Sequence, residues 1–175
     1  MEKVILVNEK DEQVGTEEKM KAHSNGGILH RAFSIFVFNS RGELMLQRRA
    51  LTKYHSKGLW TNTVCSHPRE GESILDASHR RLMEEMGFDC PLAEKFSFTY
   101  HENAGSELTE WEYDHVLFGA YEAEPKPNHE EVDAWKWVTL DELKKDVAEH
   151  PERYTAWLKI VLDRVIEERE NNNGK

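Results

Sequence analysis

Long apolar runs are missing from this chain of 175 residues, and no segment approaches the ~20 consecutive apolar residues of a membrane-spanning helix. The first residues, MEKVILVNEKDE, lack the pattern of a secretory signal peptide. Cysteine is scarce as well. Cys65 and Cys90 are too few for a disulfide framework and fit a reducing compartment, so we expect a cytoplasmic protein. Positive charge is in deficit, and a net charge of −10 argues against nucleic acid or a membrane surface as the main partner.

The residues that are present are typical of one folded domain. Hydrophobic residues make up 38% and charged residues 32% of the sequence, which is enough apolar material for a core in a chain of this length. Neither an internal repeat nor a linker interrupts the pattern. We therefore expect a single domain over residues 1–170 and a loose C-terminal tail over residues 171–175.

Hydrophobic periodicity predicts several strands, one central helix and helices near the C-terminus. The predicted strands are residues 4–7, 31–39, 43–49, 94–101, 108–123 and 134–139. A Ser-Arg-Gly turn at 40–42 predicts that the second and third strands form a hairpin, and another turn is expected at 102–106. Thr139 and Glu142 predict a capped short helix, and a longer helix should run from 151 or 152 to about 169. This order is typical of an α/β or α+β layered fold.

The densest group of reactive side chains lies in the stretch Lys57–Phe88. Its second half predicts an amphipathic helix that ends at Gly87, where a left-handed cap is usual. One face of this helix recurs every four residues: Ile74, Ser78, Leu82 and Met86. A Cys-Ser-His-Pro quartet at 65–68 stands ahead of the helix. A thiol, an imidazole, carboxylates and arginines within one loop and helix indicate a chemical role.

Histidines and carboxylates form the first candidate site. His23, His30 and His67 fall on predicted loops, whereas Glu110 and Glu112 are two residues apart on a predicted strand and project from one face. Three imidazoles and two carboxylates suit a divalent ion such as Zn²⁺, Mn²⁺ or Fe²⁺. The alternative is a set of scattered histidines beside a solvated strand face, because spacing in the sequence does not show that these groups converge.

Cys65 and Trp157 each allow two interpretations. A single cysteine is more often buried and inert than reactive, but Cys65 is close to His67, and a nearby cation would favour its thiolate. An aromatic residue on a terminal helix, such as Trp157, is usually part of the core.

Basic residues are the third candidate set in this acidic chain. The set comprises Lys19, Arg48, Arg49, Lys53, Lys57, Arg80 and Arg81. They fit a phosphate-binding pocket with a second cation on Glu85. The alternative is helix-surface pairing, such as Arg81 with Glu85 four residues later, worth about 0.3–0.5 kcal/mol.

The central stretch resembles the Nudix box, G-x5-E-x7-R-E-U-x-E-E-x-G-U, in which U is a bulky apolar residue. The matching residues are Glu72, Arg80, Leu82, Glu84, Glu85, Gly87 and Phe88. Two positions depart, because Ser66 stands at the leading glycine and Arg81 replaces the glutamate that follows the arginine. In Nudix hydrolases that glutamate belongs to the metal cluster that activates water, so Arg81 argues against diphosphate hydrolysis.

These departures resemble one branch of the superfamily, the type I isopentenyl-diphosphate isomerases. The resemblance runs from about Thr16 to Trp157. The blocks that carry it are Glu18-Lys19 ahead of His23, Leu29–Ser34, Arg48–Ala50, Trp60–Asn62, Cys65–Pro68, Glu110-x-Glu112 and Trp157. Several blocks in the same order are more specific than a Nudix box alone. They imply a Nudix α/β/α sandwich with a mixed sheet.

The resemblance also implies a role for each candidate residue. A tightly bound Mn²⁺ or Zn²⁺ would be held by His23, His30, His67, Glu110 and Glu112. Cys65 and Glu112 would transfer protons, with Tyr100 assisting Glu112. Trp157 would supply a π face for a carbocation. A Mg²⁺ on Glu85 would bridge a diphosphate, which would also contact Lys19, Arg49, Lys53, Ser66 and Arg81.

The activity implied by the resemblance is isomerisation of isopentenyl diphosphate to dimethylallyl diphosphate through a carbocation-like state. The expected partner is a small prenyl diphosphate, and the expected assembly is a monomer or weak dimer. The first alternative is a Nudix hydrolase of a nucleoside or prenyl diphosphate, against which Arg81 and Cys65 argue. The second is an inactive Nudix binding module, which would leave Cys65, Tyr100 and Trp157 unexplained together.

Overall fold

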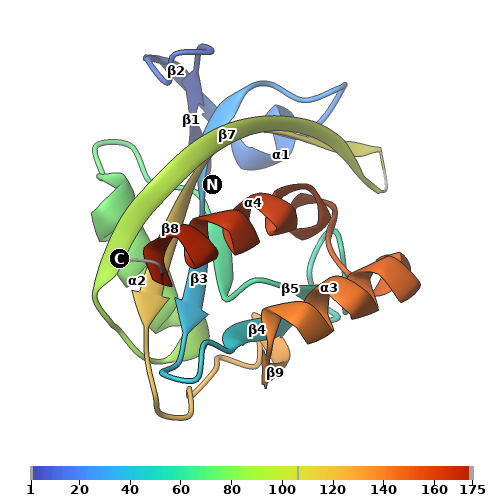
Figure 1. Ribbon diagram of the computed structural model, residues 1–175. Coiled ribbons are helices and arrows are strands. Elements are labelled where there is room, and N and C mark those ends of the chain that lie inside the picture. Colours follow the sequence, from blue (N-terminus) through green and yellow to red (C-terminus); the bar gives the residue numbers. More distant parts are fainter. Residues whose placement is uncertain (1, 106, 174–175) are drawn as a thin grey trace.

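The computed structural model of the chain describes residues 2–105 and 107–173 (Figure 1). The strands within these ranges are β1 (Lys3–Val7), β2 (Gln13–Glu18), β3 (His30–Phe38), β4 (Leu44–Arg49), β5 (Trp60–Thr61), β6 (Val64–Ser66), β7 (Leu92–Gly105), β8 (Leu108–Ala120) and β9 (Val132–Val138). The helices are α1 (Lys19–Ala22), α2 (Ile74–Met86), α3 (Leu140–Glu149), the short 3-10 helix η1 (Pro151–Arg153) and α4 (Ala156–Asn173). No helix in the described part of the chain is both long and apolar enough to cross a membrane.

Strand β3 is the centre of one mixed sheet. It runs parallel to β8 from the pair His30↔Glu112 to the pair Phe38↔Ala120, and β6 pairs antiparallel with it over Phe33–Ile35. The predicted hairpin of 31–39 with 43–49 is wrong except at its tip, where Phe38 pairs with Leu44. Beyond the tip, β4 pairs with β9 and β5 instead. The reason is that β6 and β8 already use the backbone groups of β3.

Alternation along β3 divides the core into two layers. Phe33, Ile35 and Val37 are fully buried in a cluster that includes the α2 residues Leu82 and Met86. Phe36 and Phe38, which alternate with them, belong to a second cluster. That cluster also contains Leu143 from α3 and Leu158, Val161, Leu162 and Val165 from α4. The sheet therefore lies between α2 on one face and α3 with α4 on the other, which confirms the predicted α/β/α sandwich (Figure 1).

Helix α2 ends as the sequence predicts, and its start is capped by a serine. The Ser73 hydroxyl accepts a hydrogen bond from the Asp76 backbone N–H at the first turn. Gly87 ends the helix with φ +72°, and a Cβ there would lie 2.1 Å from the Lys126 carbonyl oxygen. Only glycine fits that position, because the left-handed conformation and the close backbone contact both exclude a side chain.

Three further boundaries differ from the sequence prediction. β2 is a strand that the polar segment 13–18 does not reveal, and β1 orders it by antiparallel pairing. β7 continues to Gly105 where a turn is predicted, because the long β8 extends the ladder; residue 106 lies outside the described residues. α4 runs to Asn173, so the prediction of a loose tail is wrong for residues 171–173, whereas 174–175 lie outside the description.

Candidate active site

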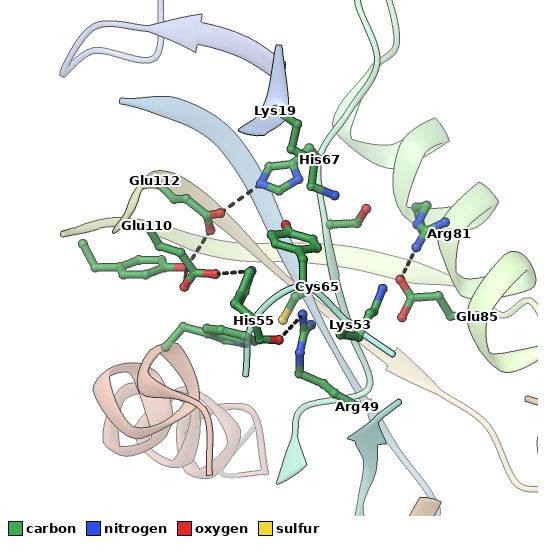
Figure 2. A pocket seen from close by; sticks show the side chains of 14 residues that line it. Lys19, Arg49, Lys53, His55, Cys65, His67, Arg81, Glu85, Glu110 and Glu112 are labelled. Atoms are coloured by element: carbon green, nitrogen blue, oxygen red, sulfur yellow. Dashed lines mark hydrogen bonds and ion pairs between the residues drawn. The ribbon is translucent and has the colours of Figure 1, made fainter. Parts of the chain in front are cut away.

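Side chains from helices, strands and a loop that are far apart in the sequence line one pocket (Figure 2). The lining residues are Lys19, Arg49, Lys53, Tyr54, His55, Cys65, Ser66, His67, Arg81, Glu85, Tyr100, Glu110, Glu112 and Trp157. Every proton-transfer and substrate-binding residue predicted from the sequence is among them. Three other members of the basic set are not. Arg80 pairs with Glu72, Arg48 pairs with Asp133, and Lys57 is exposed.

Four predicted metal ligands converge beside this pocket. His23, His30, His67 and Glu112 each offer a ligand atom, and these atoms lie within 4.8 Å of one another. Strand register explains part of the convergence, because His30 is paired with Glu112 across the β3–β8 ladder. His23 caps the C-terminus of α1, and His67 directly follows β6, which also pairs with β3. The folded chain therefore brings together residues that are far apart in the sequence.

The tautomers of two histidines suit metal ligation. Nδ1 of His23 lies 2.7 Å from the Lys19 carbonyl oxygen, and Nδ1 of His30 lies 2.7 Å from the Ile28 carbonyl oxygen. A carbonyl only accepts, so each Nδ1 carries the hydrogen and each Nε2 presents a lone pair. Among the described residues, His23 Nε2 is buried without a hydrogen-bond partner. A divalent ion would satisfy that orphaned nitrogen.

Electrostatics also favour a cation in this cluster. Burial lowers the pKa of His23, and it lowers the pKa of His67 to about 4, so both rings are neutral at pH 7 as ligands must be. Burial would raise the pKa of Glu112, but the adjacent His30 and His67 rings outweigh it and hold that pKa well below its usual range. The cluster thus combines neutral imidazoles with one carboxylate, a donor set that fits Zn²⁺ or Mn²⁺.

Glu110 lies on the same face of β8 as Glu112, as the sequence predicts, but it is not one of the four clustered residues. The Tyr100 hydroxyl donates to Glu112 at 2.6 Å and lies 3.3 Å from Glu110. Nε2 of His55 lies 3.3 Å from Glu110 (Figure 2). Burial and the nearby charge of Glu112 raise the pKa of Glu110 well above its usual range. The pKa values of the two carboxyl groups are therefore shifted in opposite directions, although the groups share a face and a tyrosine.

Cys65 reaches the pocket from β6, within a small polar network. Its thiol lies 3.1 Å from Oδ1 of Asn62 and 3.4 Å from the Ser34 hydroxyl, which donates to Asp114 at 2.7 Å. The Asn62 amide nitrogen donates to two backbone carbonyls, so its oxygen is free to accept from the thiol. Burial raises the pKa of Cys65, and the charge of Asp114 adds to the effect. In this environment the cysteine is a neutral thiol at pH 7.

The basic end of the pocket includes Arg81 on α2. Arg81 donates to Glu85 at 2.5 Å, and Gln47 donates to the other oxygen of Glu85 at 2.8 Å. Lys53 forms an ion pair with Glu131 from the segment before β9. These contacts hold Arg81 and Lys53 at this end of the pocket, each paired with a carboxylate.

Trp157 is 3% exposed, and it contacts pocket residues as well as the core. The guanidinium of Arg49 lies 5.3 Å from its ring centroid, and His55 approaches it edge-on at 6.1 Å. Its neighbours Leu158 and Val161 belong to the α4 core cluster, so the helix is anchored without Trp157. Both interpretations of this residue are therefore compatible: it is buried, and it lines the site.

Several residues of the site are not evident from the sequence. His55 and Tyr54 lie in a segment without regular periodicity, and only their position next to Lys53 could have pointed to them. Asp114 continues the alternation of Glu110 and Glu112 and was the more visible signal. Nothing in the sequence points to Gln47, because a polar residue on a strand does not reveal which distant side chain it will contact.

Comparisons with known proteins agree with this geometry. A family model described as the NUDIX domain matches residues 28–158. The "Isopentenyl-diphosphate Delta-isomerase 2" of Aromatoleum aromaticum is 56% identical over 99% of this chain and 91% of its own. The "Isopentenyl-diphosphate Delta-isomerase" of Halorhodospira halophila is 49% identical over 93% of this chain and 94% of its own. Among solved structures, DR0079 from Deinococcus radiodurans is 23% identical with a TM-score of 0.77, covering 93% of this chain and 98% of its own, and it supports the fold.

Proposed function

The chain belongs to the isopentenyl-diphosphate Delta-isomerase family of NUDIX-domain proteins, and from this we infer that it isomerises isopentenyl diphosphate to dimethylallyl diphosphate. One observation within the structure carries the inference. Cys65 and Glu112 line one pocket but come from β6 and β8, the two strands that flank β3. A thiol and a carboxylate thus approach the same space from different sides, next to a cationic end suited to a diphosphate.

The reaction explains why these groups are needed. Moving the double bond requires a proton to be added at one carbon and another to be removed two carbons away. An unactivated alkene is a very weak base, so the path passes through a tertiary carbocation or a state close to it. The acid and the base must therefore be held on either side of a five-carbon chain before reaction begins.

We assign proton transfer to Cys65 and to Glu112, with Tyr100 assisting. The hydrogen bond from Tyr100 to Glu112, at 2.6 Å, holds the carboxylate in place and polarises it. Trp157 supplies a π face to the developing cation, an interaction worth about 2 kcal/mol when it is desolvated. Lys19, Arg49, Lys53, Ser66 and Arg81 bind the diphosphate end and keep it from leaving as the cation forms.

Two cation sites complete the proposal. We propose that His23, His30, His67 and Glu112 hold a tightly bound Mn²⁺ or Zn²⁺, with Glu110 joining them when Tyr100 and His55 release it. We assign a Mg²⁺ to Glu85, where it would bind together with the diphosphate. These ions would supply positive charge that fixes Glu112 and neutralises the phosphates. A small prenyl diphosphate is the partner we propose, with a cytoplasmic location and a monomer or weak dimer.

The hydrolase alternative is disfavoured by one contact. Arg81 stands where hydrolases of this superfamily carry a glutamate, and it forms an ion pair with Glu85. The carboxylates of this segment are therefore partly neutralised, which leaves less negative charge for the cluster of ions that hydrolysis needs.

Isomerisation can be tested by incubating the protein with isopentenyl diphosphate and Mg²⁺ in D₂O and recording NMR spectra. We expect deuterium-labelled dimethylallyl diphosphate and little released phosphate. Cys65→Ala should abolish turnover, whereas the matched control Cys90→Ala, whose sulfur lies in the core beneath α2, should remain active. Rapid release of phosphate without the isomer would favour the hydrolase.

A further inference from the structure

Three basic side chains of the pocket are already paired with carboxylates, whereas Arg49 donates to the His55 carbonyl. Among the described residues, the pairs are Lys19 with Glu2 at 3.1 Å, Lys53 with Glu131, and Arg81 with Glu85 at 2.5 Å. An anion that enters must compete with these carboxylates or share the cations with them.

Glu131 is the carboxylate that contacts two of the cations. One of its oxygens pairs with Lys53, and the other lies 3.7 Å from the Arg81 guanidinium. Its backbone is fixed as well, because its carbonyl accepts from the Ala50 N–H at 3.0 Å. Burial would raise the pKa of Glu131, but Lys53 and Arg81 outweigh it and hold that pKa below its usual value, so the group is an anion.

The position of Glu131 resembles that of a phosphate group more than that of a metal ligand. Its two oxygens are directed to two basic side chains that come from different segments, the loop after β4 and helix α2. A phosphate group between Lys53 and Arg81 would use the same two contacts. Glu85, in contrast, contacts only one of these two cations, because one of its oxygens accepts from Arg81 and the other from the neutral amide of Gln47.

We propose that Glu131 is an internal substitute for the substrate's diphosphate, which holds Lys53 and Arg81 in place in the free protein and is displaced when the diphosphate binds. The proposal rests on the proposed function, since it names the group that competes with that substrate. Only molecules in which Glu131 has released the cations can bind the diphosphate fully. The apparent affinity for the diphosphate is therefore the intrinsic affinity multiplied by the fraction of such molecules. In return, the cations stay ordered and are not bound by weaker anions.

The test measures binding of inorganic pyrophosphate by calorimetry, with and without added Mg²⁺. Glu131→Gln removes the competing charge and should lower the pyrophosphate Kd at least about threefold in both conditions, as expected for loss of a partly exposed ion pair. Glu130→Gln is the matched control, because it removes the same charge from the exposed neighbouring residue. It should change the Kd much less.

A second variant isolates the contact with Lys53. Lys53→Met should weaken pyrophosphate binding, and adding Glu131→Gln to it should give a smaller gain than in the wild-type background. An unchanged or higher Kd for Glu131→Gln, relative to Glu130→Gln, would overturn the proposal. Loss of affinity only with Mg²⁺ would overturn it too, by making Glu131 a ligand of the cation. Pyrophosphate binding does not require isomerisation, so failure of the isomerase assay would be a separate result.

Discussion

Trp157 shows how one side chain can serve both the core and the site. It is buried at the start of α4, yet its ring lines the pocket beside Arg49 and His55. Packing of α4 depends mainly on the aliphatic residues that follow Trp157. A contribution to the reaction can therefore be separated from a contribution to stability.

We expect activity to decrease in the order wild type, Trp157→Phe, Trp157→Leu. Phenylalanine keeps a weaker π face, while leucine keeps apolar bulk without the quadrupole. The leucine variant should lose at least ~10-fold in kcat, about 1.4 kcal/mol. Substrate affinity should be nearly constant, because the cation exists only near the transition state. Melting temperatures of the two variants should be similar. Equal kcat for both variants would assign Trp157 to the core alone.

Helix α2 carries Arg81 and Glu85 into the pocket, and its end is fixed by one backbone contact. The Gly87 Cα is so close to the Lys126 carbonyl that a Cβ would overlap the oxygen. The segment 126–128 is bonded to the same helix end, through Lys126 N–H to Met86 O and Asn128 N–H to Glu85 O. The position of the helix end and of the segment leading to Glu131 are therefore coupled.

Gly87→Ala should lower the free energy of unfolding by more than 2 kcal/mol, because left-handed strain of about 1–2 kcal/mol adds to the overlap with Lys126. Gly71→Ala is the matched control. Gly71 has a similar φ of +79°, but nothing lies within 4 Å of a Cβ built there. Urea denaturation gives the loss of unfolding free energy for each variant. The loss in Gly71→Ala measures the left-handed strain, and the additional loss in Gly87→Ala measures the overlap with Lys126. Equal losses of stability would show that Lys126 moves away without cost.

The α3–α4 connection is tied by a hydrogen bond between elements. The Tyr154 hydroxyl donates to Asp146 on α3 at 2.5 Å, and the ring is 2% exposed within the α4 core cluster. This hydrogen bond lowers the pKa of Asp146. The contribution of this hydrogen bond to the free energy of unfolding therefore depends on pH.

Tyr154→Phe should destabilise the protein at neutral pH and much less in acid. A depressed carboxyl pKa contributes stability above the unfolded value of about 3.9, and this contribution disappears as pH falls through the folded pKa. The difference in unfolding free energy between wild type and variant should thus be constant from pH 7 to 5 and shrink below about 4. Denaturation at several pH values measures it. A difference that grows in acid would contradict the assigned hydrogen bond.

At the scale of the whole molecule, the histidine–glutamate cluster joins α1, β3, the segment after β6, and β8. An ion bound there would link segments from four parts of the chain. Such an ion stabilises the folded state because the unfolded chain has no preformed site.

His67→Ala should lose the tight ion and lower the melting temperature. Metal analysis after gel filtration should find about one Zn²⁺ or Mn²⁺ per wild-type chain and well under half in the variant. His150→Ala, at a partly exposed position after α3, is the control and should keep the metal. Chelation should lower the melting temperature of the wild type toward that of His67→Ala. Full metal content in His67→Ala would contradict the ligand assignment.

The sequence by itself determined the features that depend on neighbours along the chain. The end of α2 follows from Gly87, the α3 cap from Thr139 and Glu142, and the shared face of the two glutamates from strand alternation. Similarity in several ordered blocks was enough to predict the fold and the family. These signals are readable because capping and alternation act over two to four residues.

Only the tertiary structure decided which distant groups meet. No local pattern shows that β3 pairs with β6 and β8 instead of forming the expected hairpin with β4. That pairing places His30 opposite Glu112 and Cys65 opposite Ser34. The roles of His55 and Glu131 are equally invisible in the sequence, since each depends on a partner more than 50 residues away. Long-range pairing is set by competition among strands for the same backbone groups, and no local pattern records its outcome.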